Sequence, residues 1–195
     1  PLPLFVVPGM PRAGTTFLYH YLQRHPSILL PFRKEIDYFN DLYRFKGREW
    51  YESLYRDIKV GQIAGDISPA CWYESKTIQY IKEYNPDAKV ILSLRDPAEF
   101  AISLYVQKQT SHYDLPRSFA QFLEEGYESH LTKGGGSVFF RFVESEFGEK
   151  VELYREAFGE NLLLYDFDFF RHNQLTILRV IEDFLGLQPY FNDSN

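Results

Sequence analysis

The chain contains a single cysteine, Cys71, so no disulfide bond can form within it. A lone thiol fits a reducing compartment, and we expect Cys71 to be a small buried apolar side chain. Long apolar runs are also missing. The apolar start, residues 1–8, is far shorter than a membrane-spanning helix and lacks the positive charges that begin a signal peptide. We therefore expect a soluble chain with no membrane span, whose abrupt start at Pro1 allows it to be a piece of a longer protein.

An excess of positive charge is the second absence. The chain has 21 Lys and Arg against 27 Asp and Glu, a formal net charge of −6. Proteins that bind the nucleic-acid backbone need clustered basic residues, so this composition argues against a general nucleic-acid binder. Linker-like stretches and internal repeats are missing too. With 195 residues, of which 45% are hydrophobic, the chain is expected to form one domain over residues 1–195.

Short apolar strands alternate with amphipathic helices along the chain. Residues 4–7 predict a strand and residues 15–24 a helix, and a glycine-bearing turn joins them. Residues 89–94 predict a second strand that leads into a helix over 97–107. Further strands are expected at 62–65 and 161–165, and further helices at 49–55, 75–84, 118–127, 145–158 and 174–184.

This alternation predicts an α/β fold of the P-loop type, with three layers in which helices flank a central parallel sheet. In such sheets ligands bind beyond the carboxyl ends of the strands. Residues 9–16, 66–69 and 95–103 follow the predicted strands at that edge.

The turn after the first strand is the main motif. Residues 9–16, GMPRAGTT, have the spacing of the nucleotide P-loop G-x-x-x-x-G-K-[ST], but Thr15 stands where that motif needs lysine. The two glycines let the backbone approach an anion, and the N–H groups of residues 13–16 would point at it from the helix N-terminus. Arg12 can supply the missing positive charge. The alternative is an ordinary turn in which Thr15 or Thr16 caps the helix.

Short segments then follow in an order that a known family shares: PRAGTT at 11–16, KEIDYF at 34–39, GDISP at 65–69, LRDP at 94–97 and FLGL at 184–187. Together they resemble the superfamily of sulfotransferases that use 3′-phosphoadenosine 5′-phosphosulfate (PAPS), and in particular its carbohydrate-modifying, heparan-sulfate-type branch. The resemblance covers nearly the whole chain. It implies transfer of a sulfuryl group from PAPS to an acceptor hydroxyl or amine, first of all on a carbohydrate, with the 3′,5′-bisphosphate PAP as product and no metal.

The resemblance also assigns roles to residues. Glu35 matches the catalytic base, and Arg12 would stabilise charge on the bridging oxygen as the sulfuryl group leaves. Arg95 offers a planar fork to the 3′-phosphate, and Ser103 adds a hydroxyl from the same helix. The residues implied to bind the cofactor are Arg12, Ala13, Gly14, Thr15, Thr16, Arg95 and Ser103.

Each assignment has an alternative in ordinary structure. Glu35 could be an exposed member of the 33–35 charge cluster. Arg95 could form a surface ion pair with Asp96 or Glu99, and Ser103 could be a solvated helix serine.

The acceptor side of the site is less defined. Asp37 stands where heparan-type members often have histidine, and two nearby carboxylates can raise one pKa or bind a cationic or hydroxyl-rich acceptor. Asp66 is a candidate acceptor contact, with helix capping as its alternative. Trp72 is a candidate sugar-stacking residue, although large aromatics are more often core. The run of glycines in 133–137 is a lid or a plain solvent loop.

Two rival functions remain open. One is a P-loop kinase or NTPase that uses ATP and magnesium, which the spacing of residues 9–16 favours and the missing lysine opposes. The other is a catalytically inactive nucleotide-binding module on the same fold. His, Cys and carboxylate residues show no metal-ligand spacing. The expected partner is a small-molecule or carbohydrate acceptor, in the cytoplasm of a bacterium or, for an excised eukaryotic domain, in the Golgi lumen, and the oligomeric state stays open.

Overall fold

The computed structural model describes residues 2, 4–74, 76–110, 118–124 and 146–192. The chain divides into two compact units: residues 1–94 together with 157–195 form the first, and residues 95–156 form the second. The single domain over residues 1–195 stays a prediction.

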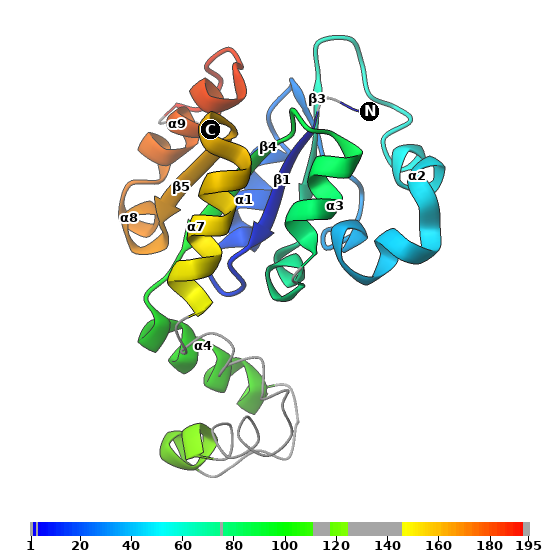
Figure 1. Cartoon of the computed structure of the whole chain (residues 1–195). Helices are drawn as coiled ribbons and strands as arrows, with labels where there is room; N and C mark the ends of the chain where they lie inside the picture. The colour runs from blue at the N-terminus through cyan, green and yellow to red at the C-terminus, as the bar shows by residue number, and fades with distance from the viewer. Residues whose placement is uncertain (1, 3, 75, 111–117, 125–145, 193–195) are drawn as a thin grey trace. The chain divides into compact units, whose positions relative to one another are not determined.

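The first unit is built on a sheet of five parallel strands in the order β2-β3-β1-β4-β5 (Figure 1). This confirms the predicted α/β fold with a central parallel sheet. The two residues of β2 are too few to give a periodic signal, and this strand was not predicted. The strands are β1 (Leu4–Gly9), β2 (Ile28–Leu29), β3 (Ile63–Ile67), β4 (Lys89–Leu94) and β5 (Leu162–Asp166).

The helices of the first unit agree with the sequence pattern except where they are short or irregular. The helix predicted at 49–55 begins earlier, directly after a π-helical turn, and the six-residue α8 was not predicted. The elements are α1 (Thr15–Leu22), η1 (Tyr38–Leu42), α2 (Tyr43–Ser53), η2 (Pro69–Tyr73), α3 (Thr77–Tyr84), η3 (Gly159–Asn161), α8 (Phe167–His172) and α9 (Gln174–Leu185).

The second unit contains α4 (Pro97–Thr110) and most of α7 (Glu146–Phe158), whose last residues belong to the first unit. Both helices were predicted. Residues 119–124 are helical, as expected for the helix predicted at 118–127, whose end lies outside the described residues.

The core of the first unit lies between one face of the sheet and helices α1, α8 and α9. Successive side chains of a strand point to opposite faces, so Phe5 and Val7 of β1 enter this core while Val6 faces the other way. Leu18 and Leu22 of α1 are four residues apart and share one helix face. Each such fully buried side chain contributes about 1.5–3 kcal/mol relative to exposure. The other face of the sheet is covered by α3 (Figure 1).

Parallel pairing places the carboxyl ends of β1 and β3 at one edge of the sheet. Val7 is in register with Ile67, so the loop after β1 and the residues after β3 begin side by side. The segment after β2 reaches the same edge, where the Glu35 N–H donates to the Ile67 carbonyl at 3.2 Å. Three segments of the first unit therefore meet there.

Candidate functional site

The loop from β1 to α1 has the form of an anion cradle. Gly14 is the N-cap of α1 at φ 75°, and the first helical bond runs from the Leu18 N–H to the Gly14 carbonyl at 3.0 Å. The N–H groups of the first helical turn therefore have no acceptor within the helix. No side chain caps this end, so the alternative in which Thr15 or Thr16 acts as N-cap is wrong. A free helix N-terminus of this kind favours a bound anion.

The cradle is fixed to the neighbouring strand β4. The Met10 N–H donates to the Ser93 carbonyl at 3.1 Å, and the Ser93 hydroxyl donates to the Ala13 carbonyl at 2.7 Å. A Cβ on Gly14 would lie 2.3 Å from the Phe167 ring, so this position needs glycine for space as well as for its positive φ. Two hydrogen bonds thus tie the loop to β4, and the ring of Phe167 leaves room only for glycine at position 14.

A lysine from another segment faces this loop. The Lys34 Nζ donates to the Thr16 hydroxyl at 3.1 Å and to the Thr15 hydroxyl at 3.4 Å, and its side chain is 16% exposed. The cation missing from the P-loop motif therefore arrives from the segment after β2. Sequence reasoning missed this role, although the lysine directly before the predicted base was a signal for it.

Arg12, to which the sequence reasoning assigned the missing charge, is exposed and has φ 62°. It lies in the same loop as Ala13, which is fully buried. Its role toward a bound anion stays a prediction.

Glu35 lies at the same place. Lys34 Nζ donates to its Oε1 at 2.7 Å, so one ammonium group joins the Glu35 carboxylate to the hydroxyls of the α1 N-terminus. The Glu35 side chain is 51% exposed and can meet a ligand from solvent. The arrangement brings a carboxylate, a cation and a helix N-terminus together, as transfer of an anionic group requires.

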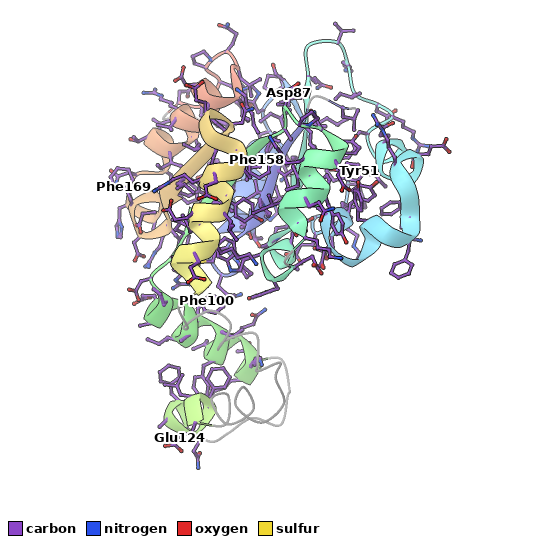
Figure 2. All side chains as sticks on the ribbon, in the orientation of Figure 1. Tyr51, Asp87, Phe100, Glu124, Phe158 and Phe169 are labelled. Carbon is purple, nitrogen blue, oxygen red and sulfur yellow. The ribbon has the colours of Figure 1, made fainter. Side chains whose placement is uncertain are left out.

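Asp66 and Asp37 occupy the interior side of this segment. Asp66 has no exposed surface, and its two carboxylate oxygens accept from the Ser68 hydroxyl at 2.6 Å and from the Tyr51 hydroxyl at 3.0 Å. Tyr51 comes from α2 and is labelled in Figure 2. Burial, with a smaller contribution from the charge of Asp37, raises the pKa of Asp66 to about 6 against the lowering effect of these two hydrogen bonds.

Two predicted acceptor contacts are therefore wrong for this structure. Asp66 is covered and both its oxygens are occupied, so it does not face an acceptor. Trp72 is 3% exposed, and a Cβ on Gly9 would lie 2.9 Å from its side chain, so the indole packs under the loop as part of the core. Asp37 is half-buried, and its backbone N–H donates to the Ser68 hydroxyl at 3.0 Å. An acceptor role for Asp37 stays a prediction.

Arg95 and Ser103 belong to the second unit. Arg95 Nη2 pairs with Glu99 Oε2 at 3.1 Å, which is the ion pair named as the alternative. The Arg95 side chain is 12% exposed and the Glu99 side chain 49% exposed, so the carboxylate partner of this pair lies partly in solvent. Ser103 is half-buried on α4, eight residues after Arg95. The 3′-phosphate role of both residues stays a prediction.

Three further expectations concern a metal site, a membrane span and the glycine run. Within residues 2–192, as far as the structure describes them, no group of three or more His, Cys, Asp or Glu side chains could hold a metal ion. Across the same described part of the chain, no helix has the length and hydrophobicity needed to span a membrane. The glycine run at 133–137 lies outside the described residues.

Known proteins resemble this chain in sequence. Residues 3–189 match the family described as "Sulfotransferase domain". The chain is 34% identical over 165 residues to "Membrane-associated sulfotransferase kil1" of Dictyostelium discoideum, which covers 82% of this chain and 32% of that protein. It is 30% identical over 205 residues to "Bifunctional heparan sulfate N-deacetylase/N-sulfotransferase 4" of Mus musculus, covering 99% and 23%. The chain thus spans a third or less of the length of these two relatives.

Solved structures show the same fold at lower identity. A sulfotransferase from Alicyclobacillus acidocaldarius aligns with a TM-score of 0.84 and 23% identity, covering 100% of this chain and 85% of that one. Mouse sulfotransferase SULT7A1, solved in complex with PAP, aligns with a TM-score of 0.65 and 20% identity, covering 98% and 60%. These likenesses concern the fold.

The buried carboxyl group of Asp66 gives a test of the site's electrostatics by pH. Its pKa of about 6 in the folded chain lies above the ordinary 3.8, so the folded state holds this proton more tightly than the unfolded state. The contribution of Asp66 to stability is therefore most favourable at low pH and is lost as pH rises through about 6. We expect the wild type to gain about 2 kcal/mol relative to Asp66→Asn between pH 7.5 and pH 4. Urea unfolding of both proteins at several pH values measures this gain, and parallel pH profiles would contradict it.

Proposed function

The chain belongs to the sulfotransferase domain family, and from this membership we propose that it transfers a sulfuryl group from PAPS to an acceptor hydroxyl or amine. One observation in the structure carries the proposal: Lys34 joins the anion cradle of α1 to the carboxylate of Glu35. In this proposal a donor phosphate on the cradle would lie next to Glu35, the proposed base for the acceptor.

The first unit offers the donor's 5′-phosphosulfate three kinds of groups. The N–H groups at the start of α1 have no acceptor within the helix and can donate hydrogen bonds to phosphate oxygens. The hydroxyls of Thr15 and Thr16 and the ammonium of Lys34 lie beside them. Arg12 adds a second positive charge from the exposed side of the loop. In the second unit, Arg95 and Ser103 are proposed to bind the 3′-phosphate.

Transfer then needs a proton acceptor and a place for the leaving charge. Glu35 takes the proton of the acceptor hydroxyl or amine as the new sulfur–oxygen or sulfur–nitrogen bond forms. Lys34 and Arg12 stabilise the negative charge that grows on the bridging oxygen as the bond from sulfur to the phosphate breaks, which leaves PAP as product. These roles require a fixed position of the reacting groups and stabilisation of negative charge, which the loop before α1 and Lys34 would provide.

A carbohydrate is the acceptor class we propose first. Support comes from the sequence similarity to a relative named for heparan sulfate N-sulfotransfer, which aligns over 99% of this chain. The exposed Glu35 and the half-buried Asp37 face a hydroxyl-rich or cationic acceptor with negative charge. Small-molecule acceptors are the alternative.

One feature of the structure favours the alternative hypothesis of a kinase, because Lys34 places a cation beside the loop that resembles a P-loop. The family match over residues 3–189 outweighs it. The two readings differ in their nucleotide, which gives the experiment that tests the proposal.

We expect PAP to stabilise the protein without magnesium, while ATP does not. A ligand that binds only the folded state at one hundred times its Kd adds about 2.7 kcal/mol. For a chain of this size that corresponds to a rise in Tm of roughly 5–10 °C. Thermal unfolding with PAP, with ATP and with ATP plus magnesium measures it. Stabilisation by ATP with magnesium, and none by PAP, would support the kinase instead.

Replacement of the lysine beside the cradle tests the donor site. We expect Lys34→Ala to weaken PAP binding about 10- to 100-fold, because a charge-assisted hydrogen bond contributes about 1.5–3 kcal/mol. Lys59→Ala is the matched control, since Lys59 is an exposed lysine of the same unit. Calorimetric titration at low salt compares both variants with the wild type. If both variants bound PAP equally more weakly, the loss of affinity would come from the change in net charge and not from the position of Lys34.

Removal of the proposed base separates an enzyme from an inactive binding module. We expect Glu35→Ala to lower transfer from labelled PAPS by about 10²- to 10⁴-fold. PAP binding should be kept or strengthened, because a negative charge next to Lys34 is removed. Glu160→Ala, which removes an exposed carboxylate elsewhere in the first unit, serves as control. Full activity of Glu35→Ala would remove Glu35 from the role of base.

A further inference from the structure

The backbone of the segment that carries Glu35 adopts an unfavourable conformation at two residues. Glu35 has φ 63° and Asp37 has φ 55°, both in the left-handed region. For residues with a Cβ this conformation costs roughly 1–2 kcal/mol each. Such residues persist only where their surroundings fix them.

Two backbone hydrogen bonds fix this segment to the end of β3. The Glu35 N–H donates to the Ile67 carbonyl at 3.2 Å, and the Asp37 N–H donates to the Ser68 hydroxyl at 3.0 Å. The first acceptor is part of the backbone. The second is a side-chain hydroxyl that can rotate, so its lone pairs must themselves be oriented.

Asp66 supplies that orientation. The Ser68 hydroxyl has one proton and donates it to Asp66 Oδ1 at 2.6 Å, which leaves its lone pairs for the Asp37 N–H. The other oxygen of Asp66 accepts from Tyr51, so the carboxylate cannot turn away. The Tyr51 ring in turn stacks on Tyr38, the residue after Asp37, with centroids 4.1 Å apart. These contacts therefore start at Asp37, pass through Ser68, Asp66 and Tyr51, and end at the neighbouring residue Tyr38.

Burial of a carboxylate in the interior of a domain lowers the free energy of unfolding relative to an apolar side chain. Asp66 and Ser68 both have 0% exposed surface, and the roles proposed above for donor and acceptor use neither of them. We infer that Asp66, acting through Ser68, is a positioning residue that sets where the Glu35 carboxylate lies relative to the cradle. This inference rests on the proposed function, because it assigns Asp66 a part in the same transfer.

Substitution of Ser68 tests the link. Ser68→Ala removes the acceptor of the Asp37 N–H, and we expect kcat to fall about 10- to 100-fold because a small displacement of a base has a large effect on rate. PAP affinity should change less than about threefold, since the long flexible Lys34 side chain tolerates a backbone shift that the base does not. Ser68→Thr restores the hydroxyl and should recover most of kcat.

Tyr55→Phe is the matched control. The Tyr55 hydroxyl is buried in the same cluster and donates its one proton to the Gly65 carbonyl at 3.1 Å; the Tyr51 hydroxyl lies 3.4 Å away, and Tyr55 donates to no atom of residues 34–37. Its loss should lower Tm as Ser68→Ala does and leave kcat within about twofold of the wild type. Equal losses of kcat in the two variants would overturn the inference, because stability alone would then explain them.

Amide hydrogen exchange decides the inference independently of turnover. In Ser68→Ala the amide of Asp37 should exchange at least about tenfold faster than in the wild type, and that of Glu35 should follow, while Tyr55→Phe leaves both unchanged. Unchanged protection of Asp37 in Ser68→Ala would overturn the positioning role. A wild type that transfers no sulfuryl group to any acceptor would instead count against the proposed function, and the exchange rates would still report on the contact between Ser68 and the Asp37 N–H.

Discussion

The ammonium group of Lys34 is the interaction on which the rest of the site depends. It donates to two hydroxyls of the first turn of α1 and to the carboxylate of Glu35. Without it, a helix N-terminus and a carboxylate would be two separate features. The contact brings the partial positive charge of the helix, a full positive charge and the proposed base Glu35 to one place. An anionic donor can bind there because the charge that would repel it, on Glu35, is already paired.

The interior beneath the site is arranged at a cost in stability. Glu35 and Asp37 have left-handed backbones, and Asp66 is a carboxylate with no exposed surface. Each lowers stability by an amount that an ordinary turn or an apolar core would avoid. Around them the parallel sheet and its Leu, Ile and Phe core supply the stability that makes this affordable. The strained and charged groups lie together beside the phosphate cradle, where function rather than packing accounts for them.

Much of the fold was readable from the sequence because it rests on local signals. Strands β1 and β4 are continuous apolar runs, and α9 ends where predicted, at Gly186 with φ 72°. The motif at residues 34–39 led to Glu35 as the proposed base, and that role stays a prediction. The errors were of a different kind. Asp66 and Trp72 were expected at the acceptor but are buried, and the contact of Lys34 with the first turn of α1 was not anticipated. A sequence gives the residues at a strand end, but it does not say which of them turn inward to a tyrosine or a glycine, nor that a lysine nineteen positions after Thr15 returns to it.

A crystal structure of the whole chain with PAP bound tests the central claim most directly. We predict that the 5′-phosphate lies on the N–H groups at the start of α1 and that Lys34 Nζ is within about 3.2 Å of one of its oxygens. Glu35 should then lie on the side of Lys34 that is open to an acceptor. A complex in which the phosphate binds away from α1, or in which Lys34 stays paired with Glu35 and contacts no phosphate oxygen, would contradict this account.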